Sequence, residues 1–135
     1  PYTNLTNLVS NVGVVATDTA GVGTIRHRLA ACGYGGDKGI FGYGAGSTPK
    51  YSITNLVSNS GVVATDTSGV GTPRIMLAAS GYGGDKGIFA FGQDTPPPHY
   101  SMSNLVSNSG VVATDTTGVG TGRLNLGGAG YSNSA

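Results

Sequence analysis

Apolar residues along the chain fall in short runs of about five to eight positions, separated by clusters of Gly, Asn, Asp and Ser. In the stretch 51–58 (YSITNLVS), apolar side chains fall on both alternating faces, as in a strand that is covered on two sides. Runs of Val, Ile, Thr and Tyr between Gly-rich turns are typical of strands, and no window has helical periodicity. The pattern predicts an all-β protein with about eleven short strands.

Each unit of this pattern predicts four strands. Using the second unit as the example, we expect them at residues 29–34, 38–43, 51–58 and 62–67. Tight turns are expected at Gly35-Gly36-Asp37 and Asn59-Ser60-Gly61, because Gly adopts positive φ freely and Asp and Asn bond to nearby backbone. A polar, Pro-containing loop would join the second strand to the third.

The strongest feature of the sequence is an internal repeat. Residues 7–26, 55–74 and 104–123 are the same at 17 of 20 positions, and the segment GYGGDKGIF occurs at both 33–41 and 81–89. We therefore treat residues 1–135 as a single repeat domain. Its units are 1–28 (half a unit), 29–76, 77–125 and 126–135 (partial).

The repeat resembles a known family. An Arg, a small apolar strand, the strand GIFGYG, a variable loop, a strand beginning Tyr-Ser, a hairpin and the motif VGTxR follow one another as in a kelch repeat. The order is most similar to the galactose-oxidase-central-domain-like repeats of phage and uncultured aquatic bacterial proteins. The chain has no Trp, and the kelch double Gly is reduced to Gly42-Tyr43-Gly44 and Phe91-Gly92. The resemblance therefore implies tandem four-stranded propeller blades but transfers no catalytic residue.

The number of strands bears on how the fold is completed. About eleven strands make about 2.75 blades, whereas a propeller usually needs four or more blades to close. We expect the N-terminal hairpin (Leu5 to Thr19) and the C-terminal strand (Leu126 to Ser132) to meet across a boundary between chains. The alternative is a closed threefold fold, a β-trefoil or a β-prism.

Composition and charge narrow the function classes. Gly accounts for 25 of the 135 residues, only 10% are charged, and the net charge is +1. This balance predicts no nucleic-acid partner, and no apolar run is long enough for insertion into a membrane. The single Cys32 cannot form an internal disulfide and excludes a Cys-based metal site.

Most charged residues recur from copy to copy. We interpret the recurring acidic and basic residues, spaced eight positions apart within a copy, as structural pairs that brace one unit or join it to the next: Asp18 and Arg26, Asp66 and Arg74, Asp115 and Arg123. A ring of these charges facing a ligand channel is the alternative.

No constellation for catalysis is evident. His27 and His99 do not recur and have no carboxylate nearby in sequence, and Cys32 occupies the place of Ser80 in the next unit. The Gly-rich segments lack the Lys-Ser/Thr pair of a phosphate-binding loop. We predict no enzyme activity, no cofactor and no metal.

Ligand binding, if present, is expected in the loops that differ between units. The candidate residues are Lys50, Tyr51, Gln93, Asp94, His99 and Tyr100. Repeated aromatic residues are expected mainly in packing between blades, although some could stack on sugar rings. Asn4 begins the one N-glycosylation triplet.

Two functional hypotheses follow. The first is a structural repeat protein whose partners are copies of itself, forming a β-blade ring or fibre on a virion or cell surface. The second is a carbohydrate-binding, lectin-like adhesion module with glycan partners. Both predict an extracellular or virion-surface location.

Overall fold

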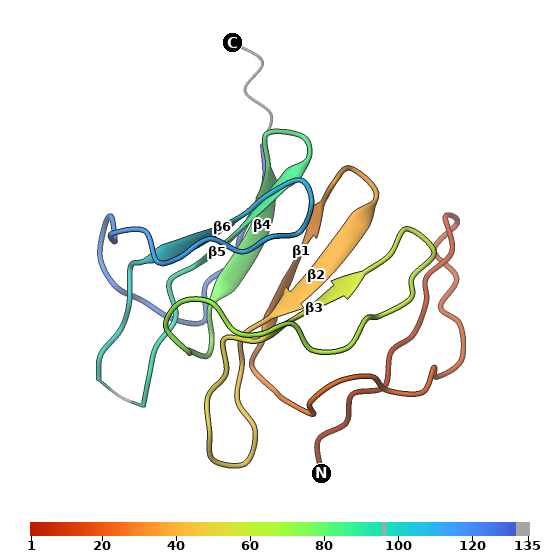
Figure 1. Ribbon diagram of the computed structural model, residues 1–135, viewed down its shortest axis with the longest axis horizontal. Coiled ribbons are helices and arrows are strands. Elements are labelled where there is room, and N and C mark those ends of the chain that lie inside the picture. The colour runs from red at the N-terminus through yellow and green to blue at the C-terminus, as the bar shows by residue number, and fades with distance from the viewer. Residues whose placement is uncertain (96, 132–135) are drawn as a thin grey trace.

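The computed structural model describes residues 1–95 and 97–131. These residues form six β-strands, in two separate three-stranded antiparallel sheets, and no helix (Figure 1). The all-β prediction is therefore confirmed. Accordingly, the described chain has no helix that is long and apolar enough to cross a membrane.

The two sheets have the same internal order, because each comes from one whole repeat unit. The first consists of β1 (Ala30–Tyr34), β2 (Lys38–Gly42) and β3 (Thr54–Val57). The second consists of β4 (Ala78–Tyr82), β5 (Lys86–Ala90) and β6 (Ser103–Val106). β2 and β5 are the central strands, and the first three strands predicted for each unit are confirmed, with ends that differ by a few residues.

The turn between β1 and β2 also follows the prediction. Gly35 has φ of 62° and Gly36 has φ of 82°, so two successive residues lie in the left-handed region. Gly is the residue that adopts this region without steric cost.

The predicted fourth strand is absent, and the reason is a β-bulge. Residues 62–67 turn back along β3, but the two segments pair only through isolated bridges, Val57 with Val63 and Thr54 with Thr67. Three steps along β3 thus face four steps along the returning segment, and this extra residue interrupts the ladder. The same offset occurs in the first and third copies. The prediction of about eleven strands is therefore wrong for the described residues.

In the first copy the loss of regular strand pairing is more complete. Residues 6–9, the cognates of β3, have no strand equivalent to β2 beside them and pair only through the bridges Thr6–Thr19 and Val9–Val15. At the other end, the described residues 126–131 do not form the predicted strand, and Ser132 lies outside the described residues.

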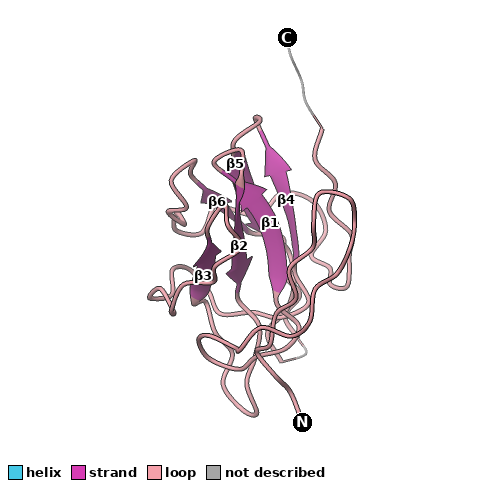
Figure 2. Ribbon diagram, turned by 90° about the vertical axis from the view of Figure 1, so that its right-hand side faces the viewer, coloured by secondary structure: helices cyan, strands magenta, loops and turns pink. Residues whose placement is uncertain are grey.

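The core lies between the two sheets. It contains Ile40 from the first sheet, Tyr43 directly after β2, and Phe89 and Val106 from the second sheet, all at most 1% exposed. The ring of Tyr43 meets the ring of Phe89 edge-on, with centroids 5.2 Å apart. β1 and β4 run side by side where the sheets meet (Figure 2).

The packing joins unlike faces of equivalent sheets. In β2 Ile40 and Gly42 are buried, whereas in β5 their cognates Ile88 and Ala90 are half-buried and Phe89 is buried instead. Because neighbouring residues of a strand point to opposite sides, one face of the first sheet packs on the opposite face of the second. Each sheet therefore keeps one face that is not in this core.

Candidate functional site

The main polar site of the molecule begins at the β-bulge. Asn55 in β3 donates from its side-chain nitrogen to the carbonyl oxygen of Ala64 at 3.1 Å and to Oδ1 of Asp66 at 2.8 Å. The first bond satisfies a backbone acceptor that the interrupted ladder leaves near the bulge, and the second holds the carboxylate in place. Asn55 is only 2% exposed, whereas Ala64 and Asp66 are exposed, so both bonds are partly shielded from water.

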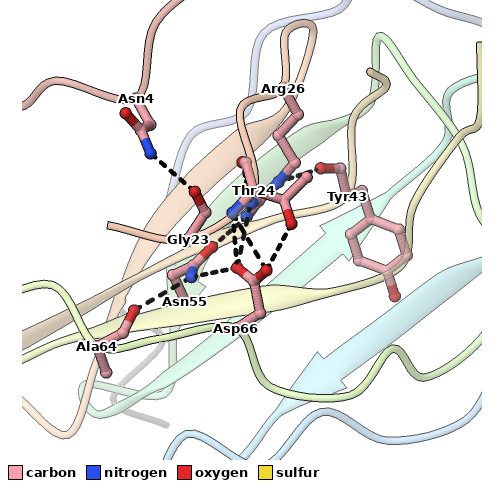
Figure 3. Close-up of polar contacts among 8 residues, drawn as sticks. All are labelled: Asn4, Gly23, Thr24, Arg26, Tyr43, Asn55, Ala64 and Asp66. Atoms are coloured by element: carbon pink, nitrogen blue, oxygen red, sulfur yellow. Dashed lines mark hydrogen bonds and ion pairs between the residues drawn. The ribbon is translucent and has the colours of Figure 1, made fainter. Parts of the chain in front are cut away.

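Residues from the preceding copy complete this site (Figure 3). Thr24 donates to Oδ2 of Asp66 from its hydroxyl at 2.6 Å and from its backbone nitrogen at 3.1 Å. Arg26 donates from Nη2 to the side-chain oxygen of Asn55 at 2.6 Å and from Nε to the carbonyl of Tyr43 at 2.8 Å. We call Thr24, Arg26, Asn55 and Asp66 the first clasp.

The same network recurs one unit further along the chain. Thr72 donates to the carboxylate of Asp115, with the hydroxyl at 2.6 Å from Oδ2. Arg74 donates to Asn104 Oδ1 at 2.8 Å and to the carbonyl of Phe91 at 2.8 Å. We call Thr72, Arg74, Asn104 and Asp115 the second clasp. Each clasp joins one copy of the repeat to the next.

The charged members of the clasps stay ionised although burial opposes their charge. Arg26 is 8% exposed and Arg74 is fully buried, and this burial lowers the pKa of both guanidinium groups, which nevertheless stay charged. Burial alone would raise the pKa of Asp66, but hydrogen bonds from Thr24 and Asn55 outweigh it and lower that pKa. The carboxylate is therefore ionised at neutral pH, with Nη1 of Arg26 at 3.9 Å from its Oδ1.

Two of the glycines in the VGT motif are explained by the clasps. Gly23 has φ of 80° and Gly71 has φ of 77°, a backbone region that L side chains rarely adopt. A Cβ on Gly71 would lie 2.5 Å from Nδ2 of Asn104, and one on Gly23 would lie 2.6 Å from Nδ2 of Asn55. We call the Asn and Asp of each clasp its acidic half, and the Thr and Arg its basic half. The backbone at each glycine thus approaches the acidic half as closely as glycine permits.

The predicted pairs of acidic and basic residues from the same copy do not contact each other in the structure. Asp66 lies against Arg26 of the preceding copy, not against Arg74 of its own copy. Asp18 accepts a hydrogen bond from Asn7, and Arg123 lies over the ring of Phe91 at 3.9 Å from its centroid. Arg26, Arg74, Asp66 and Asp115 therefore join successive copies, and the spacing of eight residues does not mark a contact.

Sequence reasoning missed the asparagine and threonine members of the clasps. The available signal was the Asn of the motif NLVS, which recurs in all three copies inside a predicted strand, where Asn is disfavoured. A polar residue kept at such a position in every copy indicates a buried hydrogen-bonding role.

The predicted ligand loops meet each other in space. Nζ of Lys50 lies 2.6 Å from Oδ1 of Asp94 and 2.6 Å from Oγ1 of Thr95, so the 45–50 loop is tied to the 93–99 loop. A cavity of about 310 Å³ lies between these loops, with Tyr2 and His27 on its wall. The two rings are stacked, with centroids 4.1 Å apart.

The remaining candidates for ligand binding in these loops are Tyr51, Tyr100, Gln93 and His99. Tyr51 and Tyr100 each donate their backbone nitrogen to a glycine carbonyl at 2.8 Å and are half-buried. Gln93 is buried and lines the cavity, whereas His99 is exposed and pairs with Gln93 through its backbone. Lys50 and Gln93 thus line this cavity, Asp94 is paired with Lys50, and neither Asp94 nor His99 is among the lining residues.

Asn4 and Cys32 both contact other parts of the fold. The side chain of Asn4 donates to the carbonyl of Gly23 at 2.7 Å, beside the first clasp (Figure 3). Cys32 is half-buried against the core, and burial raises the pKa of its thiol, which disfavours the reactive thiolate.

Comparison with known proteins gives no family assignment, because no family model and no curated protein matches this chain. The resemblance to kelch repeats therefore stays a prediction that rests on the order of motifs alone.

Proposed function

We propose that this chain is a structural repeat protein, in which consecutive β-blades are locked together into a rigid scaffold. The observation that carries the proposal is the repetition of the clasp. Of the six buried polar or charged residues of the described chain, the two arginines and two asparagines belong to the clasps: Arg26, Asn55, Arg74 and Asn104. Buried polar side chains are thus used mainly to hold one copy against the next, and the proposed role is not enzymatic.

Kelch-like propeller blades are the interpretation of the fold that we favour. Its support is that equivalent sheets stack with unlike faces together and that β1 and β4 lie side by side, as innermost strands of neighbouring blades would. A closed β-trefoil or β-prism would require the first and last copies to meet. In Figure 1 the N-terminal hairpin (red) and the end of the third copy (blue to violet) lie on opposite sides of the molecule.

We further propose that the scaffold forms a ring or fibre on a virion or cell surface. A stack of blades with unlike ends has no intrinsic stopping point, so it closes into a ring or continues as a filament. Electron microscopy of the concentrated chain tests this directly, with rings or fibres expected. Particles of single-chain size at every concentration would contradict the assembled form.

The scaffold role itself is tested through the clasp asparagines. Asn55→Ala and Asn104→Ala should each lower the free energy of unfolding by about 1–3 kcal/mol, because a buried guanidinium then loses an acceptor. Asn7→Ala is the matched control at protein concentrations where the chain is monomeric, since this cognate is exposed there and should change stability by less than about 0.5 kcal/mol. Equal stability of all three variants would count against the scaffold role.

A second candidate function, glycan binding, is favoured by the loop cavity. Lys50 on the cavity wall supplies a charged donor for sugar hydroxyl groups, the side chain of Gln93 supplies an acceptor, and the exposed ring of Tyr2 offers an apolar face for a pyranose. A glycan array with the intact chain tests this function. Binding should be lost in Lys50→Ala and kept in Lys38→Ala, an exposed lysine paired with Asp37 outside the cavity. The absence of any bound glycan would remove this candidate.

A further inference from the structure

Two half-clasps remain open, one in the first copy and one in the third. The first copy supplies the acidic half, because Asn7 donates to Asp18 at 2.8 Å and to Ala16 at 3.1 Å, the same distances as in both complete clasps. Both Asn7 and Asp18 are exposed, and within the described residues this Asn7 bond is the only hydrogen bond that Asp18 accepts. The acceptors are therefore arranged before any partner is present.

The third copy supplies the basic half. Arg123 donates from Nη1 to the carbonyl of Thr121 at 3.2 Å, as Arg74 does to Thr72 at 3.2 Å. The ring of Phe91 lies beneath the guanidinium, 3.9 Å away, and holds it in place. Arg123 is exposed, whereas its two cognates are buried, so its Nε and Nη2 are available to a partner.

The glycines mark the same two open ends. A Cβ on Gly71 would collide with Asn104 of the next copy, but one on Gly120, its cognate in the third copy, would meet nothing within 4 Å. A Cβ on Gly110 would lie 2.8 Å from Leu56 of the preceding hairpin, but one on Gly13, in the first hairpin, would also meet nothing. Contacts that recur inside the chain are therefore missing at one site on each terminal copy.

From this complementarity we infer that a second copy of the chain docks head to tail, with its Asn7 and Asp18 against Thr121 and Arg123 of the first. The inference rests on the proposed scaffold role and names its partner and contacts. Gly13 of the incoming hairpin would lie on Leu105, as Gly110 lies on Leu56 and Gly61 lies on Leu8. Leu105 is 40% exposed and free to take part in such a contact.

The two half-clasps cannot close on each other within this conformation of one chain. The hairpin of the first copy and the end of the third copy lie on opposite sides of the molecule (Figure 1). Contact between unlike surfaces of two copies is heterologous, and each added chain presents a new open half at either end. The same joint therefore generates both the ring and the fibre.

The joint between chains is weaker than a clasp within the chain. In the first clasp, β2 lies between β1 and β3 and contributes backbone hydrogen bonds to both. Neither open half provides an equivalent of β2, so the contact relies on the clasp and on stacked hairpins. We expect association to depend on protein concentration and to weaken at high salt, because exposed charges are screened.

Complementary variants give the sharpest test. A chain with Asn7→Ala and Asp18→Asn keeps only the basic half, and a chain with Thr121→Val and Arg123→Ala keeps only the acidic half. In sedimentation velocity each variant alone should stay monomeric at concentrations where the wild type associates. Its dissociation constant should be at least about tenfold higher than that of the wild type. An equimolar mixture should form one-to-one dimers and nothing larger. Unchanged association of either variant, or a wild type that does not associate, overturns the inference.

Cysteine cross-linking locates the contact and provides an internal control. In a Cys32→Ser background, Gly13→Cys with Leu105→Cys leaves both half-clasps intact and should form disulfides between chains, giving a ladder on a non-reducing gel. Gly110→Cys with Leu56→Cys should cross-link within one chain and give no ladder, because Gly110 lies against Leu56 of the same molecule. No ladder from the first pair contradicts the joint. The stability test on Asn55 and Asn104 is independent of this result, so failure of the joint and failure of the scaffold role are distinguished.

Discussion

The guanidinium of Arg74 lies 4.4 Å from the ring centroid of Tyr43, which directly follows β2 of the first sheet, while it donates to Asn104 in the second. One buried side chain thus contacts both sheets, and its removal would leave a cavity and unpaired acceptors. We expect Arg74→Ala to lower the free energy of unfolding by about 3 kcal/mol or more, measured by chemical denaturation.

The exposed cognate of Arg74 serves as the control. Arg123→Ala removes a stacked guanidinium without burying any unpaired group, so the monomer should lose less than about 1 kcal/mol. A similar loss in the two variants would show that burial between the sheets does not determine the contribution of this arginine.

A second prediction concerns the contact between Gly42 and Phe89. A Cβ on Gly42 would lie 2.7 Å from Cζ of Phe89, whose fully buried ring cannot move aside easily. Gly42→Ala should therefore destabilise the chain by about 1–3 kcal/mol. The cognate position in the second sheet holds Ala90, which is half-buried against a small cavity.

Substitutions at Gly42 and at its cognate Ala90 separate the effect of packing from the effect of strand propensity. Ala90→Gly tests the effect of glycine in a strand alone, which is expected to be below about 1 kcal/mol. If Gly42→Ala proves neutral in the melting temperature, the close packing of the two sheets at this point is refuted.

The sequence predicted the strands β1, β2 and β3 well because their apolar runs and flanking glycines are local signals. It failed for residues 62–67, where Val and Thr favour a strand but one extra residue interrupts the pairing with β3. The length of a returning segment relative to its partner is a property of the pair, so neither segment reveals it alone.

The candidate site shows the same limit at the level of side chains. Repetition identified Asp66 and Arg26 as structural residues, but not that they contact each other across 40 positions of chain. That contact depends on how two units stack, and nothing in the spacing within one copy contains this information. Lys50 and Asp94 were both found as loop candidates because their loops vary between units, whereas their ion pair needed the structure.

Acid should weaken the molecule through the clasp carboxylates. Hydrogen bonds from the neighbouring threonine and asparagine lower the pKa of Asp66 and of Asp115 despite the opposing effect of burial. A carboxyl whose folded pKa is depressed stabilises the fold above its unfolded pKa and loses that contribution as pH falls through the folded value. We expect the free energy of unfolding to fall steadily below about pH 5.

Replacement of both carboxyls isolates their share of this acid response. The Asp66→Asn and Asp115→Asn double variant should be less stable at pH 7 but less sensitive to acid, as measured by urea denaturation at several pH values. Part of the slope should remain, because Lys50 also lowers the pKa of Asp94. An unchanged slope would exclude the clasps as its origin.

A line of backbone hydrogen bonds through three left-handed residues links the copies at the start of each unit. The nitrogen of Met76 donates to the carbonyl of Arg28 at 3.1 Å, and the nitrogen of Asn125 donates to Met76 at 3.0 Å. The φ values of Arg28, Met76 and Asn125 are 57°, 57° and 53°, which are unfavourable for a long side chain and tolerated by Asn.

Arg28→Gly should therefore raise the free energy of unfolding by about 0.5–1 kcal/mol, because the relieved strain exceeds the extra entropy of glycine in the unfolded chain. Asn125→Gly is the matched comparison and should gain less. A lower melting temperature for Arg28→Gly would mean that the exposed Arg28 side chain makes a contribution larger than the strain of its backbone.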